Sequence, residues 1–448
     1  MKQQTAIALC TLFLFSTPSV AEEPLLPMGL GNNTEKFSTE EDSYSWKENL
    51  PFELNGFTET RIGKRLHDDE TQKNTSIGEA RLHLEANKDW DNLTANITGD
   101  LLYDPVLSRH SNDLNSADGW IDLRTANITF SPTDFSDVKL GRQITTWGTG
   151  DLIFINDLFS KDWNSFFIGR DDEYLKAPTD AVKVALFGDV ANLDIVYTPK
   201  FNSDRFIDGY RLSYYNGNTK AIDGRNNPVI TDERLKWFKE DEISMRLNKL
   251  IKGYETSLYY YNGYWKNPVG QSGSVYTFPE LTSYGASIRG SVAGGIANAE
   301  VGYYDSRSDD KGDDPLIRNS EFRFLVGFER ELMPELNGSV QYYLEHMIDH
   351  SNYIKNLPAG AFPKDQNRHL ITVRLTKLLM NQNLKLSFFN FYSPSDNDGY
   401  MRPKINYKID DSWTFESGGN IFYGDKKETF FGQFKDNSNV YASLRYGF

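Results

Sequence analysis

The fold class can be inferred from one segment, Asn437-Ser-Asn-Val-Tyr-Ala-Ser-Leu-Arg-Tyr-Gly-Phe448. Apolar Val440, Leu444 and Phe448 stand on one side of a strict alternation, and polar Arg445 stands on the other. A period of two residues gives a β-strand one apolar and one polar face. The apolar face can contact a protein core or lipid, and a strand can face lipid only in a closed barrel without free edges. An edge strand of a secreted β-sandwich is the alternative.

The beginning of the chain has the features of a secretion signal. Lys2 precedes an apolar run from Ala6 to Phe15, and Ser19-Val20-Ala21 forms a small-x-small cleavage site. Residues 1–21 are therefore predicted to be a signal peptide, which is too short to span a bilayer. The single cysteine, Cys10, lies inside it, so the mature chain is expected to lack disulfides, thiol chemistry and an attached haem.

The composition fits an exported barrel. Aromatic residues make up 14% of the chain, with 25 Tyr and 29 Phe, as expected for aromatic girdles at the two membrane surfaces. The sequence has no apolar run of 18 residues, and its net charge of −15 argues against nucleic acid as a partner. Residues 22–51 are polar and acidic, so we expect a flexible periplasmic N-terminal segment before a barrel over 52–448. A short plug is the alternative for this segment.

Short and long connections alternate between the strand-like segments, which is typical of transmembrane barrels. Eight short turns and nine longer loops predict about 18 strands, and the count could change by two if 209–216 forms a hairpin arm. The short turns are expected at 88–91, 131–137, 188–191, 250–253, 293–295, 333–335, 380–382 and 410–411. The longer loops are expected at 67–74, 104–118, 149–179, 200–240, 266–280, 307–319, 348–366, 394–398 and 424–437.

The alternation also assigns the two faces of the strands. Apolar sets such as Leu93, Ala95 and Ile97 are expected to face lipid, whereas charged sets such as Glu59 and Arg61 are expected to face inward. A barrel of about 18 strands is too wide for side chains to fill, so the charged face should line water. The sequence thus predicts an all-β protein: a transmembrane antiparallel β-barrel with short periplasmic turns and long extracellular loops.

The third long loop differs from the others. It follows three glycines, Gly141, Gly148 and Gly150, which permit a sharp departure from the barrel wall. Many large apolar side chains in 149–180 would be exposed if the loop pointed outward, so it is expected to fold into the lumen. We expect its charged residues, with the carboxylates unpaired, to form a constriction. The candidates are Asp151, Asp157, Asp162, Arg170, Asp171 and Asp172.

The sequence Gly141-Arg-Gln…Trp147-Gly-x-Gly-Asp151 resembles a motif in uncharacterised porin-like barrels of Gram-negative bacteria, more distantly the alginate-export type. The terminal Phe448 is similar to the last residue of outer-membrane barrels, where it is read by the barrel assembly machinery. The resemblance implies location in the cell outer membrane, with outer-membrane lipid and lipopolysaccharide as surroundings and the assembly machinery as a partner.

Arginines recur on the predicted inward face and are candidates for pore lining. One hypothesis is a ladder that passes small polar or anionic solutes, because guanidinium groups match carboxylate and phosphate. The other is a set of neutralising ion pairs with the inward carboxylates. The nine arginines are Arg61, Arg81, Arg124, Arg246, Arg289, Arg323, Arg374, Arg402 and Arg445.

Residues for catalysis or metal binding form no recognisable constellation. Of six histidines only His83 is expected to face the lumen, and the H-E-x-x-H signature is absent. Residues 305–314 and 396–399 are acidic but lack the spacing of a calcium loop. We therefore expect no cofactor, no metal and no catalytic site, and a channel or export pore for small polar or charged solutes. The alternatives are a barrel enzyme of the lipase or protease type and a barrel sheath of an electron-transfer complex.

Overall fold

The computed structural model describes residues 50–107 and 111–448, and all structural statements below concern these residues. The expected signal peptide (1–21) and nearly all of the expected N-terminal segment (22–51) lie outside the described residues.

Eighteen antiparallel strands form one closed sheet, so the predicted fold class and strand count are confirmed. Each strand pairs with the next one along the barrel, and β22 pairs with β1 to close the sheet. The barrel strands are β1 (Glu53–Arg65), β2 (Thr75–Trp90), β3 (Leu93–Tyr103), β4 (Ile121–Thr133), β5 (Ser136–Gln143), β6 (Thr179–Leu186), β7 (Asn192–Thr198), β10 (Glu242–Ile251), β11 (Tyr254–Tyr264), β14 (Glu280–Val292), β15 (Gly295–Ser306), β16 (Glu321–Met333), β17 (Leu336–Met347), β18 (Asn367–Leu379), β19 (Leu384–Ser393), β20 (Asp398–Lys408), β21 (Trp413–Gly424) and β22 (Asn439–Gly447).

The remaining elements belong to the long loops. Of the suspected hairpin arm 209–216, only Tyr214–Asn216 forms a strand, and it pairs only within its own loop, so the barrel count is unchanged. The elements are the hairpins β8 (Tyr214–Asn216) with β9 (Ala221–Asp223) and β12 (Gly270–Ser272) with β13 (Val275–Thr277), and the short helices α1 (Trp163–Ile168), η2 (Asp172–Leu175), α2 (His350–Asn356) and η3 (Gly432–Asn437).

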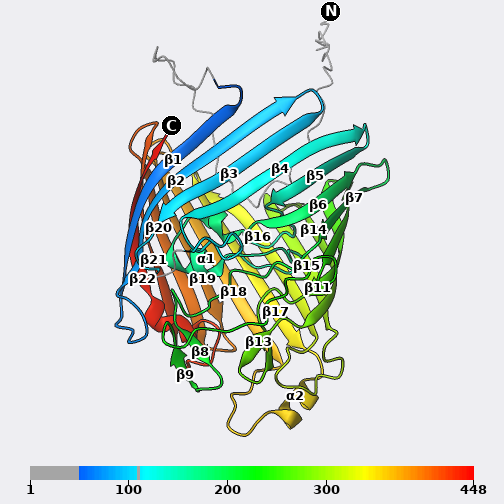
Figure 1. Cartoon of the computed structure of the whole chain (residues 1–448), viewed down its shortest axis with the longest axis vertical. Helices are drawn as coiled ribbons and strands as arrows, with labels where there is room; N and C mark the ends of the chain where they lie inside the picture. The colour runs from blue at the N-terminus through cyan, green and yellow to red at the C-terminus, as the bar shows by residue number, and fades with distance from the viewer. Residues whose placement is uncertain (1–49, 108–110) are drawn as a thin grey trace, which may run out of the picture.

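Two-residue turns close several of the hairpins at one end of the barrel. Lys252 and Gly253 both have positive φ, as do Ala293 and Gly294, which matches the turn type that fits the right-handed twist of paired strands. Figure 1 shows the C-terminus at this short-turn end and β8, β9, β13 and α2 at the opposite end. The predicted segregation of short turns from long loops is therefore present.

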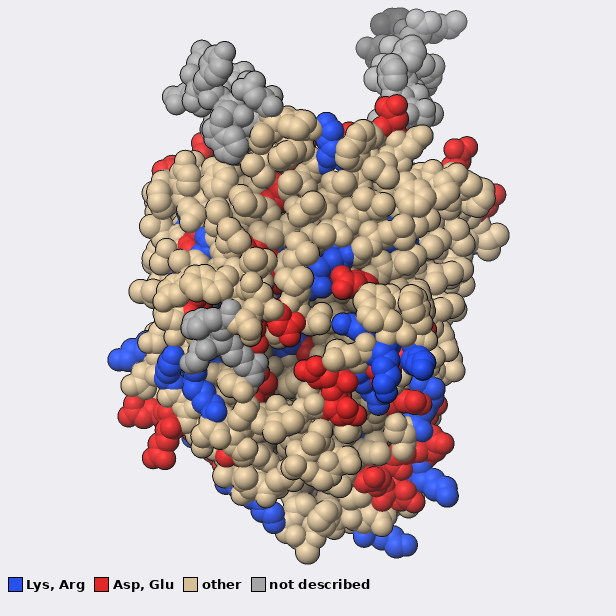
Figure 2. Space-filling view, viewed as in Figure 1, with Lys and Arg blue, Asp and Glu red and all other residues tan. Residues whose placement is uncertain are grey.

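The two faces of the wall differ as the alternation predicted. Outward Ile97 and Leu444 are 56% and 43% exposed, whereas inward Glu59 and Arg61 are 5% and 1% exposed. In Figure 2 the half of the molecule at the short-turn end is mostly tan, and charged side chains gather over the half that carries the long loops. A largely uncharged surface of this kind suits lipid contact.

Among the described residues, no helix combines the length and apolar character needed to cross a membrane.

The closed hydrogen-bonded sheet leads to a first prediction. Because all strands have partners on both sides, the purified protein should keep an almost purely β circular dichroism spectrum in detergent at room temperature. It should also migrate differently on gels before and after boiling. A spectrum dominated by helix, or solubility without detergent after removal of residues 1–21, would contradict the membrane-barrel assignment.

Candidate functional site

The third long loop leaves the barrel wall completely and enters the lumen. Gln143, the last residue of β5, pairs with Thr179, the first residue of β6, so the strands stay adjacent while residues 144–178 lie between them. The backbone amide of Asp151 hydrogen bonds with Gln341 of β17, 2.7 Å away. The loop therefore reaches strands far around the barrel from its own, and the expected inward fold is confirmed.

The glycines at its start are required for this path. Gly141 and Gly148 have φ of 114° and 87°, where residues with a side chain are strained. Gly150 is needed for a different reason, because a Cβ there would lie 2.3 Å from the carbonyl oxygen of Ile153.

Glu300, an inward residue of β15, anchors the first half of the loop. One carboxylate oxygen accepts hydrogen bonds from the backbone amides of Thr149 and Gly150, the latter at 2.8 Å. The other accepts the side-chain amide of Asn156 at 3.1 Å. A fully buried carboxylate needs such donors, because an unpaired buried charge is very costly. Glu300 appeared in the sequence only as one of many inward charges, and no local pattern marks it as the anchor.

The anchor gives a second prediction. Glu300→Ala should release residues 149–156 from the wall, since each hydrogen bond to a charged group contributes about 1.5–3 kcal/mol. Single-channel recordings should then show a noisier current with more frequent transitions, while the barrel still assembles. Glu255→Ala removes another inward carboxylate, on β11, and should leave the current unchanged. Equal noise in both variants would argue against the anchor role.

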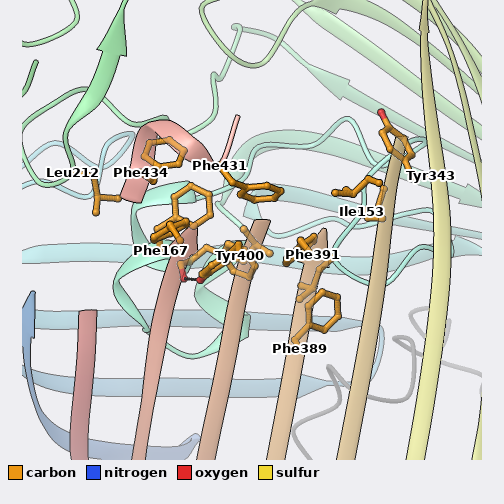
Figure 3. Packing of buried hydrophobic residues seen from close by; sticks show 14 of the residues in the cluster. Ile153, Phe167, Leu212, Tyr343, Phe389, Phe391, Tyr400, Phe431 and Phe434 are labelled. Carbon is orange, nitrogen blue, oxygen red and sulfur yellow. Dashed lines mark hydrogen bonds between the residues drawn. The ribbon is translucent and has the colours of Figure 1, made fainter. Parts of the chain in front are cut away.

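An aromatic cluster holds the second half of the loop against the opposite wall. Asp162 caps α1 by accepting the amide of Ser165 at 2.7 Å. The ring of Phe167 lies edge-on to Tyr400 of β20 and Phe422 of β21, with centroids 5.4 and 5.1 Å away. Figure 3 shows Phe167 and Tyr400 side by side, with Phe431 and Phe434 of the last long loop next to them. The apolar side chains that made an outward loop implausible are thus buried inside the barrel.

The loop carboxylates are paired with bases, so the expectation of unpaired charge is wrong. The wall supplies most partners, because its inward arginines lie at the height the loop crosses. The pairs are Asp151 with Arg374 (2.6 Å), Asp157 with Lys161 (2.9 Å), Asp162 with Arg205 (3.2 Å), Asp171 with Arg61 (3.4 Å) and Arg445, and Asp172 with Arg402 (2.7 Å). Arg170, expected as an opposing charge for the loop, instead pairs with Glu79 of β2, its Nε 3.0 Å from the carboxylate.

Exposure separates the loop aspartates into two groups. Asp157 and Asp162 are 4% and 2% exposed and hold the loop together internally. The side chains of Asp171 and Asp172 are 13% and 17% exposed and so remain in contact with lumen water. Asp151, at 14%, resembles the second group. The partly exposed aspartates are thus accessible from the lumen, and the buried ones are not.

The charges around η2 shift the acidities of two neighbouring carboxyls in opposite directions. Burial would raise the pKa of Asp172, but Arg402, with Lys404 and Arg374 nearby, outweighs it and holds that pKa well below its usual range. Enclosure raises the pKa of Glu173, and the negative charge of Asp171 raises it further. Asp172 therefore stays ionised in acid, whereas Glu173 gains a proton more readily than an ordinary glutamate.

The inward arginines form ion pairs around the wall. Arg289 on β14 is the register partner of Glu255 on the neighbouring strand β11. The other eight have a carboxylate within 4.0 Å: Arg61 with Glu59 and Glu416, Arg81 with Glu79, Arg124 with Asp122, Arg246 with Asp194, Arg323 with Glu321, Arg374 with Asp151, Arg402 with Asp172 and Arg445 with Glu59. The arrangement matches the neutralising-pair hypothesis, and an anion ladder stays a prediction.

A polar cavity of ≈ 240 Å³ lies between η2 and the wall formed by β2, β3 and β4. The loop contributes acidic, basic and aromatic groups, and the wall contributes mainly polar ones. The lining residues are His83, Glu85, Thr98, Arg124, Thr125, Ile144, Asp172, Glu173, Tyr174 and Lys176. The alternation predicted that His83 and Arg124 face inward, but nothing in the sequence indicated that Glu173 and Tyr174 would lie beside them.

The long loop between β7 and β10 also enters the barrel, which the sequence did not indicate. Arg205 is 5% exposed and pairs with Asp162 of the third loop and with Asp122 of β4, at 2.8 Å. Further along, Ser213 hydrogen bonds with Asn437, 3.1 Å away in the last long loop. Arg205 thus connects the β7–β10 loop and the third long loop to β4 of the wall. Through Asp162, the N-cap residue of α1, it also fixes the position of that helix.

Two histidines illustrate how the described imidazoles are held. His83 faces the lumen as predicted, and its Nδ1 lies 2.6 Å from Asp100. His346 lies on the outer face with Nδ1 2.7 Å from the amide oxygen of Asn367, and its neighbours two residues away on the same face are Leu344 and Ile348. The contact with Asn367 orients the imidazole of His346.

The two acidic loops use their carboxylates internally. Asp309 accepts the backbone amides of Asp313 and Asp314 at 3.2 and 3.1 Å. Asp396 pairs with Arg368 at 2.8 Å. In the part of the chain that the structure describes, no group of three or more His, Cys, Asp or Glu side chains is arranged to hold a metal ion.

Comparisons with known proteins bear on the fold alone. No family model matches the sequence, and no curated protein matches it. Among solved structures, Acinetobacter baumannii OccAB4 superposes with a TM-score of 0.54 at 11% identity, covering 90% of this chain and 99% of that one. Acinetobacter baumannii OccAB3 gives 0.52 at 8% identity, covering 88% and 98% of the two chains. Pseudomonas aeruginosa OccK11 gives 0.50 at 8%, covering 88% and 95%.

These comparisons lend no support to the more distant alginate-export resemblance of Gly141 to Asp151. The structural neighbours are outer-membrane porins of Gram-negative bacteria, and this chain has the fold of that porin-like class of barrels.

Proposed function

We propose that this protein is an outer-membrane channel through which small polar or charged solutes diffuse, with no chemical step. The observation that carries the proposal is the charged loop folded across a lumen whose wall is itself charged. A closed barrel with an apolar outside and such an interior offers solutes a water-filled path with a narrow passage. The porin-like fold of the solved neighbours supports the same function.

Selectivity in this proposal comes from the groups around η2. The ion pairs of the wall cancel most of the interior charge, so the partly exposed Asp171, Asp172 and Glu173 and the bases beside them act on ions at close range. Charges in a narrow passage with protein walls interact strongly, because screening by water and salt is weaker there than in bulk solvent. The channel should therefore discriminate by charge as well as by size.

Planar-bilayer recording of the purified barrel tests the proposed function. Insertion should produce discrete conductance steps, and reversal potentials in a salt gradient should give the preference between anions and cations. Barrels that insert correctly but produce no steps would contradict a diffusion channel. A hydrolytic activity abolished by His346→Ala would favour the barrel-enzyme alternative instead.

The acidities around η2 give a third prediction. As the pH falls from 8 to 4, Glu173 should lose its charge first, since its pKa is raised, while the lowered pKa of Asp172 keeps that carboxylate ionised. Cation preference should therefore decrease at a pH above the usual titration range of glutamate. Glu173→Gln should remove this step in the reversal potential, and Asp172→Asn should leave it in place. A step that survives Glu173→Gln would assign it to another group.

A further inference from the structure

One side of the barrel wall is too short to cross a membrane by itself. β5 and β6 have 8 residues each and β7 has 7, whereas a membrane-crossing strand needs about 9–11. Figure 1 shows β6 and β7 in the half of the molecule that contains the short turns. If the protein spans the outer membrane as proposed above, the outer lipid boundary on this side passes just beyond Thr198, the last residue of β7.

The end of the β7–β10 loop lies at this height on the outer side of the wall. The backbone amide of Phe238 donates to the carbonyl of Pro199, the first residue after β7, at 2.7 Å. The hydroxyl of Tyr197 donates to Asp241 at 2.8 Å. Tyr197 points outward, because its neighbour Val196 is inward and 2% exposed. Residues 235–241 therefore continue the outer surface of the wall where β7 stops.

This segment exposes large apolar side chains next to lysines. Trp237 and Phe238 are 53% and 69% exposed, with ring centroids 6.1 Å apart. The ammonium of Lys200 lies 5.9 Å from the Trp237 ring. Lys236 is 74% exposed and only 3.9 Å from Glu240, a weak surface pair. We define the rim patch as Lys200, Leu235, Lys236, Trp237, Phe238 and Lys239.

We propose that the rim patch binds a phosphorylated glycolipid of the outer leaflet, the lipid A part of lipopolysaccharide. Trp237, Phe238 and Leu235 enter the boundary between head groups and acyl chains, where amphipathic aromatic rings are favoured. The three lysines contact the lipid phosphates, which carry the charge that complements them. The patch completes the apolar wall that β5 to β7 leave short.

The composition of the rim patch favours lipid over a second copy of the chain. Lysine is depleted at the centre of protein interfaces, yet Lys236 and Lys239 flank Trp237 and Phe238 in this segment. A stable protein interface also involves about 20–30 residues on each side, far more than this segment offers. Aromatic residues flanked by lysines are the usual composition of a membrane-surface contact.

The test measures lipid binding by the full-length barrel in detergent, with lipid A and dephosphorylated lipid A as probes. Lys200→Gln/Lys236→Gln/Lys239→Gln should lose roughly a hundredfold in affinity for lipid A, at roughly fivefold for each lysine. It should lose little affinity for the dephosphorylated probe. Trp237→Ser/Phe238→Ser should weaken binding of both probes, because the apolar contact does not depend on phosphate.

A matched control exists elsewhere on the long loops. Phe362 is 37% exposed with the ammonium of Lys426 5.4 Å from its ring, so it repeats the aromatic–lysine pair away from the short wall. Phe362→Ser/Lys426→Gln should bind both probes like the unchanged barrel. Equal binding by all variants would overturn the proposal. So would a change in oligomeric state without a change in lipid affinity, since the patch would then be a subunit contact.

The same material separates this inference from the proposed channel. A barrel that binds lipid A through the rim patch but shows no conductance steps would overturn the channel and leave the lipid site in place. A conducting barrel whose lipid binding is unchanged by substitutions in the rim patch would overturn the lipid site and leave the channel in place.

Discussion

A barrel in which residues 144–178 are replaced by Asn-Gly is expected to conduct severalfold more current than the unchanged protein. Gln143 and Thr179 are already paired across β5 and β6, so a two-residue turn can join them without moving either strand. The deletion removes the segment that contacts β17 and β20 and so widens the lumen, while the inward part of the β7–β10 loop remains. Single-channel conductance in planar bilayers measures the effect, and heat-modifiable migration confirms that the barrel still forms.

The barrel should survive this deletion because its 18-strand ladder does not include the loop. The wall charges that lose partners, such as Arg402 and Glu300, would then contact water, which removes the cost of leaving them buried. Removing residues 271–276 deletes all of the β12–β13 hairpin except Gly270 and Thr277; the hairpin lies outside the barrel sheet, so this variant serves as the control. Unchanged conductance after the loop deletion would show that 144–178 is not the constriction.

Asp171→Asn/Asp172→Asn is expected to shift ion selectivity strongly toward anions. Asp171 lies against Arg61 and Arg445, and Asp172 against Arg402. Removing both carboxylates leaves these guanidinium groups with less opposing charge in a passage where screening is weak. The reversal potential in a potassium chloride gradient should move toward the chloride value.

The buried aspartates provide a matched comparison with the same change in formal charge. Asp157→Asn/Asp162→Asn also removes two negative charges from the loop, but both side chains are buried against Lys161 and Arg205. Breaking a buried pair typically costs about 3–5 kcal/mol, so this variant should have a less stable loop and a smaller shift in selectivity. Equal shifts in the two variants would mean that total loop charge, rather than position, sets the preference.

The strand count and the two faces of the wall could be predicted from the sequence. Each strand repeats a two-residue alternation, and alternation is a local property that does not depend on the rest of the fold. The inward position of Glu59, Arg61 and Arg445 and the outward position of Leu444 follow from it directly. The apolar content of 149–180 also sufficed to predict an inward loop, because burying that surface is favourable wherever the loop lies.

The charge of the candidate site was decided by the tertiary structure. Asp171 meets Arg61 and Arg445, which are 110 and 274 residues away, and Asp151 meets Arg374 at a separation of 223. The same fold brings the carboxylate of Glu300 to the backbone amide of Thr149 and pairs Arg205 with Asp162. Such contacts depend on barrel closure, on strand register and on the path of the loop, which together bring distant parts of the chain to one height in the lumen. A local pattern shows which residues carry charge, but only the closed barrel decides which charges remain unbalanced.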